Sequence, residues 1–145
     1  MPNRARFRTT WDGLFISEEP PHGATVIVRR RDGGTVEYLL LHRADATDGD
    51  WAWGPPAGVR LPGEDIEACA RRALEDSTGL RLPLHCVTDD PTWAAFWVEA
   101  RPLAEIALTG DYDGFAWAPL DEAVHRCRPA IVGEQFEQLA AVVAA

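Results

Sequence analysis

The sequence contains no lysine, and its 14 arginines are outnumbered by 23 acidic residues, which gives a formal net charge of −9 over 145 residues. So acidic a protein is a poor candidate for nonspecific binding to nucleic acid or to an anionic membrane surface, because both need a positive protein surface. Arginine does suit bidentate contacts with phosphate groups. If a protein this acidic binds phosphate groups, it needs a divalent metal ion or a local arginine cluster to offset the repulsion.

Cysteine is scarce, and long hydrophobic runs are absent. Cys69, Cys86 and Cys127 are odd in number and lack CxxC or metal-ligand spacing, which indicates reduced thiols rather than a disulfide framework. No window has the length of a membrane span, and the arginines at positions 4, 6 and 8 are not followed by the apolar run of a signal peptide. We expect a cytoplasmic protein that does not associate with membranes.

Hydrophobic patterning predicts a single domain over residues 20–145, preceded by an irregular lead-in at residues 1–19. Several strands, a helix, further strands and terminal helices follow in that order, which is typical of a mixed sheet with helices on its faces and of the α/β (α+β) class. The run Leu39–Leu41 indicates a strand that is buried on both faces. The predicted strands are Ala24–Arg30, Val36–His42, Leu82–Val87, Thr92–Ala100, Ile106–Leu108 and Phe115–Ala118, and terminal helices begin at Pro119 and near Val132.

The segment Gly58–Leu80, here called the box segment, contains the helix around which the chain is organised. A Pro/Gly-rich approach over Trp51–Ala57 leads into it, residues 62–65 open the helix, and Gly79 closes it. Apolar residues recur at i, i+3, i+4, i+7 and i+8, the spacing of an amphipathic helix, and they are Ile66, Cys69, Ala70, Ala73 and Leu74.

The spacing of this segment resembles the box of the Nudix (MutT-like) hydrolases. That pattern is Gly, five residues, Glu, seven residues, Arg, one residue, an aliphatic, four residues and Gly-aliphatic, and it is filled by Gly58, Glu64, Arg72, Leu74, Gly79 and Leu80. A W-x-x-P-x-G sequence from Trp53 and the segment FAWAPLDEA from Phe115 extend the resemblance. It implies an α/β/α sandwich with a mixed sheet. It also implies a hydrolase that cleaves the phosphoanhydride of a nucleoside diphosphate linked to another moiety.

The box segment is degenerate at the positions that hold acidic residues in the family. The family has Glu directly after the arginine and a Glu-Glu pair three and four residues later, and these places hold Ala73, Asp76 and Ser77. Acids at these positions would share one helix face and converge on Mg²⁺ or Mn²⁺, which take oxygen ligands. Ala73 and Ser77 instead project onto the apolar stripe, as in an ordinary packing helix. We therefore expect hydrolysis that is impaired.

By resemblance, the remaining residues receive candidate roles. The metal would be held by Asp76, Glu64 and backbone carbonyls around Gly58. The catalytic candidates are Glu64, Arg72, which would fix the helix and its carboxylates, and Asp111, which precedes Trp117 by six residues. The candidate residues for substrate binding are Trp53 and Arg43.

Each role has an alternative that the residues leave open. Asp76 also fits a solvated acid at a helix end, Arg72 a surface ion pair, and Asp111 an ordinary loop residue. Glu64 also fits a first-turn acid favoured by the helix dipole, and the tryptophans fit core packing. At the level of the protein, the alternative is a Nudix-fold protein without catalysis that binds a nucleotide-like ligand or a protein partner. A homodimer is implied by the resemblance alone.

Overall fold

The computed structural model describes residues 20–45, 49–88, 91–109 and 111–144, so the predicted lead-in at residues 1–19 lies outside it. The described residues form a seven-stranded mixed sheet with the central order β3-β2-β1-β6-β5, to which β4 adds beside β1 and β7 beside β2. Strands β1 and β6 are parallel, and the other pairs are antiparallel. The strands are β1 (Gly23–Asp32), β2 (Thr35–Arg43), β3 (Trp53–Gly54), β4 (Ala57–Val59), β5 (His85–Thr88), β6 (Ala94–Glu99) and β7 (Tyr112–Ala118).

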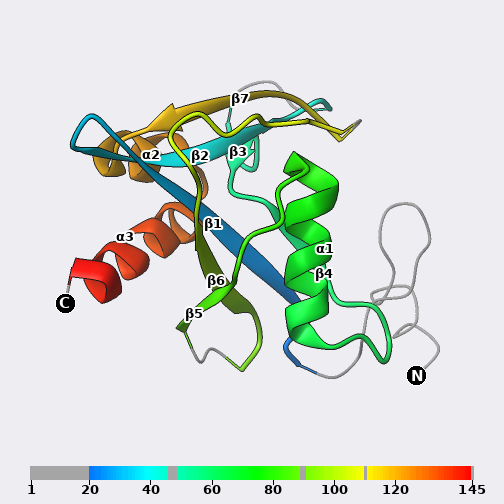
Figure 1. The fold of residues 1–145 in the computed structure, drawn as a ribbon. Coiled ribbons are helices and arrows are strands. Elements are labelled where there is room, and N and C mark those ends of the chain that lie inside the picture. The colour runs from blue at the N-terminus through cyan, green and yellow to red at the C-terminus, as the bar shows by residue number, and fades with distance from the viewer. Residues whose placement is uncertain (1–19, 46–48, 89–90, 110, 145) are drawn as a thin grey trace.

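Helices cover both faces of the sheet, which confirms the predicted α/β/α sandwich. Helix α1 (Ile66–Thr78) lies on one side of β1, and α2 (Leu120–Arg126) and α3 (Ala130–Ala144) lie on the other (Figure 1). Alternate residues of the central strands feed two cores. Leu39 and Leu41 pack with α1, whereas Leu40 packs with α2 and α3. The prediction that Leu39–Leu41 is buried on both faces is therefore correct, and none of the helices in the described ranges has the length and apolar character of a membrane span.

Local signals at both ends of α1 act as the sequence predicts. The helix begins at Ile66, because the Asp65 side chain accepts hydrogen bonds from the N–H groups of Glu67 and Ala68 and so caps it. It ends at Thr78, and the C-cap residue Gly79 has a φ of 76° and donates its N–H to the carbonyl of Glu75. This left-handed conformation suits a residue without a Cβ.

The structure corrects three predicted strands and adds two. Residues 106–108 do not form a strand, because the Ala107 N–H donates to the Thr78 carbonyl at the end of α1 instead of to a neighbouring strand. Strand β5 begins at His85, three residues later than predicted, and β7 begins at Tyr112, three residues earlier than predicted. The Pro/Gly-rich approach contains β3 and β4, which are short and were not predicted.

Candidate functional site

Arg72 and Glu64 are brought together by α1 and the loop before it. The Nε and Nη2 atoms of Arg72 donate to the two Glu64 carboxylate oxygens at 2.9 and 3.0 Å, and Nη2 also donates to the Val59 carbonyl at 2.8 Å. The Leu61 N–H donates to Glu64 Oε1 at 3.0 Å. The hydrogen bonds from Arg72, followed by that from Leu61, hold the pKa of Glu64 below its ordinary value, against the opposing effect of burial. Arg72 thus ties α1 to β4 and to the loop, which is more than an isolated surface ion pair does.

Ala73 and Gly58 pack directly against each other. Ala73 is 4% exposed, and a Cβ placed on Gly58 would lie 3.2 Å from the Ala73 Cβ. The Gly58 carbonyl faces α1, where the Cys69 thiol donates to it at 3.6 Å. Burial raises the pKa of Cys69 to about 11, so the thiol keeps its proton at neutral pH. The predicted carbonyl ligand Gly58 therefore already accepts a weak hydrogen bond from its own helix.

Ser77 is also buried, 5% exposed, and lies close enough to the phenol of Tyr112 on β7 to lower the pKa of that phenol. Arg43 is the β2 residue opposite Tyr112 in the sheet, and the Ala44 N–H donates to the Asp111 carbonyl at 3.0 Å. Burial raises the pKa of Tyr112, the Arg43 charge lowers it, and the Asp111 charge raises it. The structure thus gathers Arg43, Asp111 and Ser77 around Tyr112, at the C-terminal end of α1.

Within the part of the chain that the structure describes, the residues do not form the acidic cluster that a divalent metal site needs. Asp76 is exposed on α1, and its charge is one of the smaller causes that raise the pKa of Arg72. Both carboxylate oxygens of Glu64 are already engaged by Arg72. Within the described ranges, no group of three His, Cys, Asp or Glu side chains is placed to hold a metal ion. The hard oxygen cage that Mg²⁺ or Mn²⁺ prefers is therefore incomplete, and the metal-binding roles of Asp76, Glu64 and Gly58 remain predictions.

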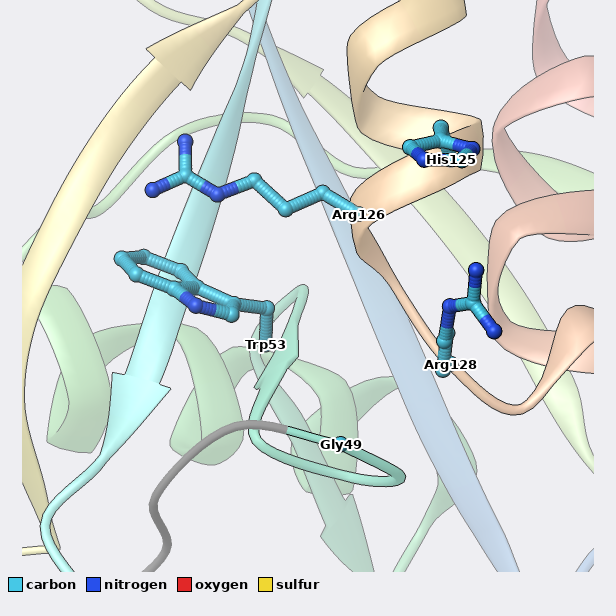
Figure 2. A pocket seen from close by; sticks show the side chains of 5 residues that line it. All are labelled: Gly49, Trp53, His125, Arg126 and Arg128. Carbon is cyan, nitrogen blue, oxygen red and sulfur yellow. The ribbon is translucent and has the colours of Figure 1, made fainter.

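Trp53 lies on the other face of the sheet, away from Arg43. Its ring lies 4.8 Å from the His42 ring, and the guanidinium carbon of Arg126 lies 4.1 Å from its centroid. His42 and Arg43 are successive residues of β2 and point to opposite faces, so the structure does not bring the two candidate residues for substrate binding together. Trp53 instead borders an open hollow of about 480 Å³, which is lined by Gly49, Trp53, His125, Arg126 and Arg128 (Figure 2).

Sequence reasoning missed the basic residues of this hollow. The signal was present as the run His125-Arg126-Cys127-Arg128, a concentration of basic residues in a chain that is acidic as a whole. Spacing along the chain gives this run no functional role. Only the packing of α2 against β3 places Arg126 over the Trp53 ring.

Comparison with known proteins agrees with this architecture. A family model described as the NUDIX domain matches residues 20–139. The bis(5'-nucleosyl)-tetraphosphatase (asymmetrical) of Rattus norvegicus is 31% identical over 131 residues, which cover 81% of this chain and 82% of the rat protein.

Solved structures with the same fold are more distant in sequence. The Caenorhabditis elegans Ap4A hydrolase in a binary complex matches with a TM-score of 0.70 and 20% identity, covering 84% of this chain and 96% of that one. The NUDIX domain of Shewanella oneidensis NrtR, crystallised with ADP ribose, matches with a TM-score of 0.64 and 14% identity, covering 83% of this chain and 86% of that one. The match to the family model and the identity to the rat enzyme, in a chain with this sandwich and box segment, show that the protein belongs to the Nudix hydrolase family.

Proposed function

We propose that this protein binds a nucleoside diphosphate linked to another moiety and hydrolyses its phosphoanhydride with a severely impaired, metal-dependent activity. The observation that carries the proposal is the contrast within α1. Arg72 donates hydrogen bonds to Glu64 and Val59, whereas Ala73 and Ser77 are buried, with Ser77 beside Tyr112. The frame of the box is retained and its acidic side chains are largely absent.

The chemistry explains why this loss matters. Cleaving a phosphoanhydride needs an oriented water molecule, a base and neutralisation of the charge on the phosphates. Nudix hydrolases generally obtain this neutralisation from divalent metal ions. Each general acid or base typically contributes about 10²–10⁴ to the rate. Replacing two acidic positions by Ala73 and Ser77 is therefore expected to lower turnover by several powers of ten.

Within this proposal the remaining candidates keep separate roles. Arg72 and Glu64 position the loop against α1. Asp76 is the exposed acid that remains to attract Mg²⁺ or Mn²⁺, with low affinity because it belongs to no metal-holding cluster among the described residues. Asp111 lies beside Tyr112 at the same end of the helix. Arg43, which is paired with Tyr112 across the sheet, is the residue that we propose to contact a phosphate of the ligand. The three free cysteines of the chain are consistent with a reducing, cytoplasmic location.

The test is phosphate release from a panel of nucleoside diphosphate derivatives with Mg²⁺ or Mn²⁺. We expect slow turnover by the wild type and at least about 10² faster turnover by the double variant Ala73→Glu/Ser77→Glu. Ala68→Glu, which adds a carboxylate at an exposed position of the same helix, is the matched control and should not increase the rate. A wild-type rate within the ordinary enzyme range of about 1–10³ s⁻¹ would contradict the proposed impairment.

A second candidate function is binding without catalysis, of a nucleotide-like ligand or a protein partner. It is favoured by the lack of any three-acid group in the described part of the chain. The two functions separate when calorimetric binding of the same panel is compared with turnover. Ligand binding with no phosphate release, even after long incubation with metal, supports the second function, and metal-dependent release rules it out. Sedimentation of the same samples tests the homodimer that the family resemblance suggests.

A further inference from the structure

The hollow bordered by Trp53 lies on the side of the sheet that carries α2 and α3, opposite the box segment. Its lining residues come from three places: the loop at Gly49, strand β3, and the end of α2 with the turn that follows it. Figure 2 shows Arg126 extending across the Trp53 ring, whereas His125 and Arg128 lie on the other side of the hollow, beside α3. Cationic side chains therefore flank the hollow from two sides.

The positive charge here is unusual for this protein. Arg126 and Arg128 lie two residues apart, with His125 beside them, in a chain with a formal net charge of −9. Arg126 has one ion-pair partner at its own helix, Glu122, at 3.1 Å, and both side chains of this pair are at least one third exposed. Among the described residues, the Arg128 side chain forms no ion pair or hydrogen bond. Most of the capacity of these guanidinium groups to donate hydrogen bonds is therefore left for a ligand.

We infer that this hollow is an anion site that binds a ligand with two or more linked phosphate groups. Guanidinium groups contact phosphate oxygens in a bidentate geometry. Because Arg126 and Arg128 lie on opposite sides of the hollow, we expect a single phosphate to contact one guanidinium group and a diphosphate to contact both. The ring of Trp53 is covered by Arg126 and lies against His42, so it holds the arginine in place rather than stacking on a base. The site is separate from the function proposed for the box segment.

Replacing Glu122 should raise the affinity for the anion, whereas replacing the arginines should lower it. Its carboxylate competes with a bound phosphate for Arg126. Replacing Glu122 by Gln removes the competitor and leaves the cation, so affinity for the anion should increase. An exposed pair of this kind is weak, and the expected gain is about two- to fivefold. A purely structural role of the Arg126–Glu122 pair would not strengthen binding.

The experiment is calorimetric titration of the whole chain with inorganic pyrophosphate and with orthophosphate, in EDTA so that metal plays no part. Pyrophosphate is expected to bind more tightly than orthophosphate. The double variant Arg126→Gln/Arg128→Gln should lose at least about tenfold in affinity, and Arg128→Gln alone should lose part of it. One control should keep wild-type affinity: Arg81→Gln, at an exposed arginine that pairs with Glu75 at 2.6 Å. The variant Arg43→Gln tests whether pyrophosphate binds at the box side of the sheet instead.

The indole N–H signal of Trp53 in the nuclear magnetic resonance spectrum, assigned with Trp53→Phe, reports whether pyrophosphate binds in this hollow. It should shift on addition of pyrophosphate in the wild type and in Glu122→Gln. The inference is overturned if the wild type does not bind pyrophosphate. It is also overturned if the double variant binds as the wild type does while its melting temperature is unchanged, or if Arg43→Gln abolishes binding instead.

Discussion

Arg71 and Arg72 are consecutive residues of α1, and they contact very different partners. Arg72 donates to both Glu64 oxygens and to the Val59 carbonyl, whereas Arg71 contacts Glu67 at 3.5 Å on the exposed face of the helix. Removing a charged donor that satisfies partly buried acceptors costs more than removing one partner of an exposed pair. We predict that Arg72→Ala lowers the free energy of unfolding by about 2 kcal/mol, and Arg71→Ala by less than about 0.5 kcal/mol.

Urea denaturation followed by circular dichroism measures both values. Equal effects of the two substitutions would show that the contacts of Arg72 contribute no more than those of its exposed neighbour. The comparison is well matched, because both variants remove the same side chain from the same helix.

Glu64 makes part of the stability depend on pH. Its folded-state pKa is lowered, chiefly by Arg72, from an ordinary value of 4.5. Folding therefore favours the ionised carboxylate, and this contribution is fully present above 4.5 and lost as the pH falls through the folded-state pKa. We predict that Glu64→Gln is less stable than the wild type at neutral pH, and that the difference shrinks on acidification below pH 4.5.

Unfolding curves recorded between neutral pH and acidic pH test this expectation. The control is the same substitution in the Arg72→Ala background, where the cause of the shift is gone and the pH dependence of the difference should largely disappear. A difference between Glu64→Gln and the wild type that stays constant across the acidic range would show that Arg72 does not lower this pKa.

At the scale of secondary-structure elements, α2 and α3 pack closely because of one glycine. Gly133 of α3 is buried, and a Cβ placed on it would lie 2.5 Å from the Val124 carbonyl oxygen and 3.1 Å from the Val124 Cα. These are backbone atoms of α2, so the helices themselves would have to move apart. We predict that Gly133→Ala destabilises the protein by about 1–3 kcal/mol, the usual cost of overpacking.

Gly54→Ala is the matched control, since its Cβ would lie 3.5 Å from Val132 Cγ1, an ordinary contact. Its effect should stay within about 0.5 kcal/mol. Thermal and urea unfolding compare the two variants, and a Gly133→Ala protein as stable as the wild type would show that α2 and α3 can separate without cost. Because Arg126 lies at the end of α2 and Arg128 in the turn before α3, the same variant should also alter the hollow that they line.

At the scale of the whole molecule, the incomplete acid set predicts that metal contributes little to stability. A ligand that binds only the folded state adds about 2.7 kcal/mol when present at 100 times its dissociation constant. Without a three-acid group in the described ranges, we expect the melting temperature of the wild type to be the same in EDTA and in millimolar Mg²⁺.

The variant Ala73→Glu/Ser77→Glu should instead melt at a higher temperature with Mg²⁺ than in EDTA, because it restores two carboxylates to the helix face that holds Asp76. Differential scanning fluorimetry measures both proteins in parallel. A wild-type melting temperature that rises with Mg²⁺ and falls with EDTA would show that a metal site exists that the family pattern does not describe.

Local features of this protein follow from the sequence alone. The limits of α1 depend on Asp65 and Gly79, which act on neighbouring backbone groups. The burial of Leu39–Leu41 on both faces depends on the alternation of a strand. The burial of Ala73 and Ser77 follows from the apolar stripe of the helix. These features are set by residues within one or two helical turns, so their spacing suffices to predict them.

Other features depend on contacts between residues far apart in the chain, and only the tertiary structure decides them. Strands β3 and β4 are too short for a periodic signal and exist because β2 and β1 supply their hydrogen bonds. Whether acids converge on a metal is a matter of geometry, and spacing could not show that both Glu64 oxygens are taken by Arg72. The hollow forms only when α2 brings Arg126 onto Trp53, 73 residues away in the sequence, because side chains from two elements must be packed together to build it.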